Sequence, residues 1–141
     1  MKPCVLDASV IAAVFFQEPG AEKVRALLTS GRDMHAPDLV YAELANVICK
    51  RFGRGEVDRD DAGLMLSKFL SLPLKVTPCD ELVEPSLQLA LATGRTVYDC
   101  LYLALAVRLD SVLFTADKKL VNALAETPLV KHVEFVGGSR V

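Results

Sequence analysis

Residues 3–17 read PCVLDASVIAAVFFQ, a short apolar strand that passes at once into an apolar helical run. Asp7 ends the strand, and Ser9 is expected to cap a helix that stops near Pro19-Gly20. A strand that leads directly into a helix is the first half of a β–α–β unit. This stretch therefore predicts an α/β fold with an acidic side chain at the carboxyl end of its first strand.

The alternation of strand and helix continues to the end of the chain. We expect further strands near residues 34–36, 74–78, 111–115 and 133–136. We expect helices over about residues 21–30, 37–53, 58–71, 81–93, 96–109 and 117–126. Because parallel strands are joined by helical crossovers, this order predicts one three-layer α/β/α domain over residues 1–141 with a mainly parallel sheet.

Composition narrows the class of protein. Of the 141 residues, 52% are hydrophobic, which excludes a disordered chain and a disulfide-dependent miniprotein. The formal net charge of −2 gives no sign of a strongly basic nucleic-acid binder. The cysteines form no C-x-x-C pair, so we expect reduced thiols rather than a zinc site. The chain has no secretory pattern and no apolar stretch of about 20 residues, which predicts a cytoplasmic protein without membrane contact.

Four acidic residues fall at one edge of the predicted sheet. In a parallel β–α fold, the carboxyl ends of the strands and the amino ends of the helices share this edge. The four are Asp7, Glu43, Asp99 and Asp117. Asp7 has a simpler interpretation as a turn residue, and Asp117 has one as a helix N-cap. Asp99 has a simpler interpretation as the acidic member of a capping box that Thr96 opens.

Glu43 is harder to explain as a structural residue, because it interrupts the apolar helix face of Val40, Leu44 and Val47. A partly buried carboxylate is costly unless it is paired or bound to a metal ion. Four carboxylates at one edge also repel one another, and divalent cations remove that repulsion. Because all the ligands are oxygens, the cluster predicts Mg²⁺ or Mn²⁺ and phosphoryl chemistry.

Four segments of the chain resemble a known family. VLDASVI at Asp7, APDLVYAELANVI at Glu43, TVYDCLYLALA at Asp99 and LFTADKKL at Asp117 are similar, in order and spacing, to the motifs of PIN domains. The likeness is greatest to the VapC-like toxins of bacterial and archaeal toxin–antitoxin pairs. The resemblance implies a parallel sheet of about five strands. It also implies a Mg²⁺- or Mn²⁺-dependent endoribonuclease whose catalytic and metal-binding residues are those four acids.

The resemblance implies supporting residues and partners as well. The partners are an RNA substrate, an antitoxin protein that covers the site, and a second copy of the chain in a homodimer. Ser9 and Thr115 fit the family's hydroxyl positions, where they would hydrogen-bond a carboxylate or phosphate. An N-cap and a strand position explain the same two residues equally well. The basic residues that could contact RNA phosphates, with solvated surface charge as the alternative, are Lys118, Lys119, Arg95, Arg51 and Arg54.

Two other functions stay open at this point, and the sequence argues against a third. A non-toxin PIN nuclease of RNA processing and a catalytically inactive PIN-like binding module would carry the same motifs. A haloacid-dehalogenase-like phosphatase needs a second Asp two residues after the first, where this chain has Ser9. When the four acids are set aside, the formal charge of −2 becomes +2, so the surface offered to RNA is mildly basic.

Overall fold

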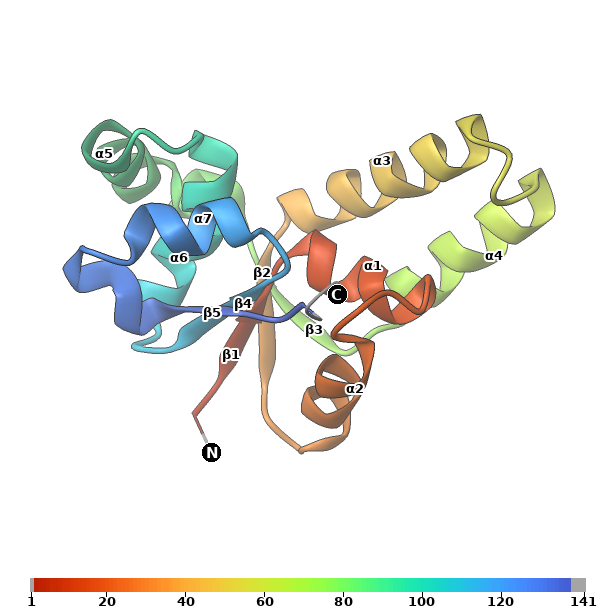
Figure 1. Ribbon diagram of the computed structural model, residues 1–141, viewed down its shortest axis with the longest axis horizontal. Helices are drawn as coiled ribbons and strands as arrows, with labels where there is room; N and C mark the ends of the chain where they lie inside the picture. Colours follow the sequence, from red (N-terminus) through yellow and green to blue (C-terminus); the bar gives the residue numbers. More distant parts are fainter. Residues whose placement is uncertain (1, 138–141) are drawn as a thin grey trace.

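A computed structural model describes residues 2–137 of the chain. They form a five-stranded, all-parallel sheet with the strand order β3-β2-β1-β4-β5 (Figure 1). The strands are β1 (Cys4–Leu6), β2 (Met34–Pro37), β3 (Leu74–Thr77), β4 (Val112–Thr115) and β5 (Val133–Phe135). The predicted fold class is confirmed, and each strand lies within two residues of its expected place.

Helices cover both faces of the sheet (Figure 1). One face carries the helices of the first two crossovers: α1 (Ala8–Phe15), α2 (Ala21–Thr29), α3 (Leu39–Gly53) and α4 (Arg59–Leu70). The other face carries α5 (Val83–Thr93), α6 (Val97–Arg108) and α7 (Lys118–Leu124). The sides differ because right-handed crossovers change face when the chain turns back across the sheet after β3. Two short 3₁₀ helices, η1 (Cys79–Glu81) and η2 (Pro128–His132), complete the described elements.

The α6 helix lies at the centre of one layer. Its side chains are buried without interruption from Cys100 to Ala106, as its apolar sequence predicted. It packs against the neighbouring strands β1, β2 and β4. On the other face of the sheet, α3 and α4 form a long hairpin that extends away from the sheet (Figure 1). Phe69 of α4 is fully buried and packs edge-on against Phe15 of α1, with the ring centres 4.2 Å apart, which anchors the hairpin.

Two helix starts differ from the expectation. The N-cap of α1 is Asp7 rather than Ser9, because the Asp7 Oδ1 atom accepts the Val10 N–H at 3.1 Å. Pro37 is the last residue of β2 rather than part of the next helix. Its missing N–H does not interrupt the pairing with β3, because the N–H of the next residue, Asp38, donates to the Thr77 carbonyl oxygen at 2.9 Å.

No helix between residues 2 and 137 has both the length and the apolarity that a membrane crossing requires. All four cysteines are free thiols, as expected: Cys4 and Cys100 are buried, Cys79 is half-buried and Cys49 is exposed.

Candidate active site

Four carboxylates meet at the carboxyl edge of the sheet. Asp7 follows β1 and Asp117 follows β4, and these two strands are neighbours. Glu43 reaches the same place from the second turn of α3, and Asp99 from the first turn of α6. All four side chains line one cavity of about 130 Å³. The structure thus brings together the four acids that the sequence analysis singled out from distant parts of the chain.

The pKa of the Asp7 carboxyl group is strongly raised. Its Oδ1 atom accepts hydrogen bonds from the Ser9 hydroxyl and the Val10 N–H. Burial raises the pKa of Asp7 to about 6, although hydrogen bonds from Ser9, Thr115 and Val10 oppose the rise, and the charge of Glu43 adds a smaller increase. An ionised Asp7 is therefore costly in this place unless a cation accompanies it.

Two hydroxyl groups tie the turns around Asp7 and Asp117 together. Ser9 Oγ donates to Asp7 and accepts the Ala116 N–H at 3.1 Å. Thr115 is fully buried, and its Oγ1 atom accepts the Asp117 N–H at 3.0 Å. Both residues lie where the sequence analysis placed them, and their contacts orient acidic groups of the cavity.

Tyr102 is a residue of the site that the sequence analysis missed. Its hydroxyl donates to Glu43 Oε1 at 2.5 Å, and its side chain is only 3% exposed. Burial raises the pKa of Glu43; the Tyr102 hydrogen bond opposes that rise and the charge of Asp99 adds to it. Burial and the nearby Glu43 charge also raise the pKa of Tyr102, so the phenol stays a proton donor. The available signal was its spacing, because Tyr102 follows Asp99 by three residues on one helix face.

Asp99 is only partly used as a helix-capping residue. Thr96 Oγ1 accepts the Asp99 N–H at 3.1 Å, which is half of the predicted capping box. The Asp99 carboxylate itself lies 3.1 Å from Arg95 Nη2. The same nitrogen lies 3.5 Å from Asp117 Oδ2, so one guanidinium bridges two acids from different helices. Arg95 is therefore directed into the site.

Asp117 combines a capping role with a place in the site. Its Oδ1 atom accepts the Lys119 N–H at 3.0 Å and the Leu120 N–H at 3.3 Å, as its N-cap interpretation predicted. Its second oxygen, Oδ2, lies 3.5 Å from Arg95 Nη2. Lys118 and Lys119 are exposed in the first turn of α7, beside this carboxylate.

The two arginines at the end of α3 differ in their surroundings. Arg54 is exposed at the turn of the α3–α4 hairpin. Arg51 is half-buried, forms ion pairs with Glu18 and Glu56, and stacks 4.2 Å above the ring centre of Phe16. Arg51 thus fastens the hairpin to the end of α1, and its guanidinium is engaged in these contacts.

The donor set of the cavity fits a hard divalent cation. Its candidate ligands are carboxylates, and neither His nor Cys lines it. Within residues 2–137, no three acidic, His or Cys side chains already form a metal cage. Ser9, Tyr102 and Arg95 each contact a carboxylate oxygen of the cavity.

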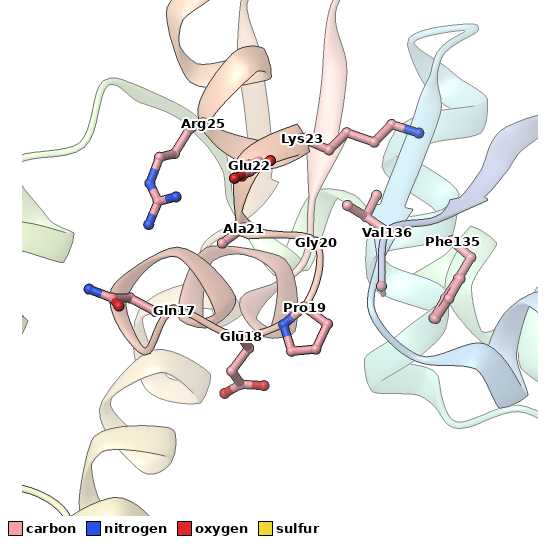
Figure 2. A pocket seen from close by; sticks show the side chains of 11 residues that line it. Gln17, Glu18, Pro19, Gly20, Ala21, Glu22, Lys23, Arg25, Phe135 and Val136 are labelled. Atoms are coloured by element: carbon pink, nitrogen blue, oxygen red, sulfur yellow. The ribbon is translucent and has the colours of Figure 1, made fainter. Parts of the chain in front are cut away.

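A larger hollow of about 750 Å³ lies beside the α1–α2 loop and the end of β5 (Figure 2). Two of its charged side chains form ion pairs, Glu18 with Arg51 and Lys23 with Glu134, and Glu22 and Arg25 also line it. The loop passes close to the chain after β5, since a Cβ atom on Gly20 would lie 2.7 Å from the Val136 carbonyl oxygen. This hollow therefore lacks the converging acids of the smaller cavity.

Comparison with known proteins connects this geometry to a family. Residues 4–125 match the family model described as PIN domain. The chain is 36% identical over 120 residues to "Ribonuclease VapC3" of Pyrobaculum aerophilum, covering 84% of this chain and 92% of that protein. It is 29% identical over 119 residues to "Ribonuclease VapC12" of Mycobacterium tuberculosis, covering 84% and 90%.

Two solved structures share the fold. The crystal structure of PAE2754 from Pyrobaculum aerophilum superposes with a TM-score of 0.68 and 27% identity, covering 96% of this chain and 84% of that one. A toxin–antitoxin complex from Klebsiella pneumoniae contains a chain that superposes with a TM-score of 0.63 and 15% identity, covering 96% and 99%.

Proposed function

The chain belongs to the PIN domain family, and on that basis we propose that it is a Mg²⁺- or Mn²⁺-dependent endoribonuclease, the toxin of a VapBC-type pair. One observation carries the proposal: Asp7, Glu43, Asp99 and Asp117 line a single cavity at the carboxyl edge of the sheet. Ligands of open parallel sheets bind at this edge. The similarity to proteins named VapC ribonucleases supports RNA as the substrate.

Asp7, Asp99 and Asp117 would hold the ion through their carboxylates. When bound, it supplies a Lewis acid that lowers the pKa of water and offsets charge on the scissile phosphate. Ser9 and Thr115 keep the turns that carry Asp7 and Asp117 in place through their hydroxyl groups.

Glu43 is the candidate general base. Its raised pKa makes its carboxylate a better proton acceptor than an ordinary glutamate. Tyr102 holds Oε1 by its hydrogen bond, so Oε2 is the oxygen that takes the proton from the attacking water. The water oxygen then bonds to phosphorus, the bond to the 3′ oxygen breaks, and the leaving 3′ oxygen takes a proton from solvent water. The products are a 5′-phosphate and a 3′-hydroxyl.

An antitoxin is the first proposed partner. An open apolar groove of about 350 Å³ lies between α3 and α4, lined by Ile48, Phe52 and Leu66 among others. Because the groove is concave, the same groove of a second copy could not fill it. An amphipathic helix from another protein fits such a surface. The likeness to a chain of a toxin–antitoxin complex supports this assignment.

A second copy of the chain is the other proposed partner. Val83, Leu87 and Leu91 are exposed and spaced four residues apart along α5, and exposed Tyr98 follows at the start of α6. A straight apolar stripe can pair with its own copy across a two-fold axis. The double variant L87E/L91E should therefore elute as a monomer in light-scattering chromatography where the parent chain is a dimer, and L64E on α4 is the control.

RNA cleavage tests the nuclease proposal. Purified chain is incubated with end-labelled RNA and Mg²⁺ or Mn²⁺, beside D7N, D99N and the control D61N at the start of α4. We expect cleavage to need the ion, to leave 5′-phosphate ends, and to fall by about 10²-fold or more in the two site variants only. Equal cleavage by all four proteins would identify a contaminant and overturn the proposal. Binding of RNA without cleavage would favour the inactive binding module.

Toxicity and compartment follow from the same proposal. An RNA-cutting enzyme with four free thiols is expected to act in the cytoplasm. Expression of the parent chain should arrest bacterial growth, whereas D7N should not. Growth that continues despite active nuclease in the lysate would favour a role in RNA processing over a toxin.

A further inference from the structure

Arg95 occupies an unusual place for a positive residue. It lies between Gly94, which ends α5 with a φ of 72°, and Thr96, which caps α6. This short connection aims the side chain inward, where it is only 25% exposed. Its Nη2 atom contacts both Asp99 and Asp117, which the proposed function uses as metal ligands.

The rest of the guanidinium is less well accommodated. Its Nε–H is buried and has no hydrogen-bond acceptor among residues 2–137. A buried donor without an acceptor is unfavourable, so this position of Arg95 depends on the attraction of the two carboxylates. Removing their negative charge therefore removes what holds Arg95 there.

We propose that Arg95 is an internal counter-ion that occupies the Oδ2 atoms of Asp99 and Asp117 in the metal-free protein and competes with a divalent ion for them. The inference rests on the proposed function, because it takes these two acids as ligands. The guanidinium lowers the repulsion between the carboxylates when no ion is present, and it must leave both oxygens when an ion binds. The resting protein then has a weaker affinity for metal than its four carboxylates alone would give.

The size of the effect follows from the competition. If the site is open for an ion in only about a tenth of the molecules, the apparent dissociation constant is raised about tenfold. Removing Arg95 should therefore tighten binding by about that factor. A solvent-exposed positive charge should have much less effect, because solvent screens it.

Calorimetric titration of the full-length chain with Mn²⁺ tests the competition. R95Q should bind Mn²⁺ about tenfold more tightly than the parent chain. K118Q is the charge-matched control, since Lys118 is exposed beside Asp117, and it should change the affinity little. D99N and D117N should lose binding. Equal or weaker Mn²⁺ affinity in R95Q, with binding still lost in D99N and D117N, would overturn the counter-ion while leaving the proposed function intact.

Nuclear magnetic resonance gives a second, independent measurement. The Arg95 Nε–H signal, assigned by its absence in R95Q, should exchange slowly with solvent in the metal-free protein because the group is buried. Saturating Mg²⁺ should shift this signal and speed its exchange. An unchanged Arg95 signal at saturating Mg²⁺ would overturn the proposal. If neither the parent chain nor R95Q binds Mn²⁺ or Mg²⁺, the proposed metal-dependent function fails together with it.

Discussion

Replacing Asp7 with Asn should stabilise the metal-free protein, an unusual result for a residue of an active site. The amide keeps an oxygen that can accept the Ser9 hydroxyl and the Val10 N–H, so the N-cap of α1 survives. What the substitution removes is the negative charge that burial disfavours.

The magnitude follows from the pKa of about 6, against an ordinary value of 3.8. Each unit corresponds to about 1.4 kcal/mol, so the ionised carboxylate costs at most about 3 kcal/mol at pH 8. The side chain keeps some contact with solvent, which lowers the expected gain to about 1–2 kcal/mol. For a chain of this length, the melting temperature should rise by about 3–6 °C.

The pH dependence has a definite sign. A carboxyl group whose pKa is higher in the folded state binds its proton more tightly there, so it favours folding at low pH and opposes it as the pH rises through 6. The stability difference between D7N and the parent chain should be largest at pH 8 and fall to about half by pH 5. Subtracting the stability of the parent chain from that of D7N cancels the pH-dependent contributions of other groups. One such group is Asp33, whose pKa is lowered by its hydrogen bond with Lys75.

Urea unfolding in EDTA from pH 5 to pH 8 measures this difference, with D61N as a control that should show no trend. Added Mg²⁺ should stabilise the parent chain and reduce the advantage of D7N, because the variant lacks one of the proposed ligands. A D7N protein that is less stable than the parent at pH 8 in EDTA would refute the buried-charge argument. So would a stability difference that does not change with pH.

Three further substitutions test the contacts around the site and hairpin. Y102F leaves Glu43 Oε1 without its buried donor, so the free energy of unfolding should drop by about 1–3 kcal/mol at pH 8. Carboxyl titration by NMR should show a higher pKa for Glu43, and an unchanged titration would contradict the contact. R51A removes two ion pairs and a stacking contact, so the free energy of unfolding should drop by about 1–2 kcal/mol. Hydrogen exchange should speed up across α3 and α4, and unchanged protection there would count against the anchoring role of Arg51. F69A empties a fully buried site against Phe15 and should cost about 3–5 kcal/mol in urea unfolding, and a loss below about 1 kcal/mol would show that the hairpin does not depend on it.

The fold was predictable because the sequence pattern and the topology constrain each other. Apolar strands such as residues 111–115 alternate with amphipathic or apolar helices, and such an order leaves few arrangements besides a parallel sheet. The same topology placed Asp7, Asp99 and Asp117 at one edge without any knowledge of distances. The start of α1 was harder, since Asp7 and Ser9 are both good N-caps and only the geometry of the turn selects between them.

The contacts between side chains were beyond the reach of the pattern. Arg95 and Asp99 are four residues apart and could pair on any helix, but the contact of Arg95 with Asp117 exists only because α6 and α7 start at the same edge. Arg51 resembled a surface cation at a basic turn, yet its partner Glu18 lies 33 residues earlier in the sequence. Such pairs depend on how helices are placed in space, which single-sequence periodicity does not report.

The spread of the acids along the chain has a consequence for synthesis on the ribosome. Asp7 emerges first and Asp117 last, because β4, the neighbour of β1 in the sheet and the strand that precedes Asp117, is made after most of the protein. A nascent chain that ends before Asp117 holds at most three of the four carboxylates. If all four acids are needed for the proposed ribonuclease, the chain would stay inactive until the polypeptide is nearly finished. The proposed antitoxin, made at the same time, could then bind the enzyme as it completes its fold.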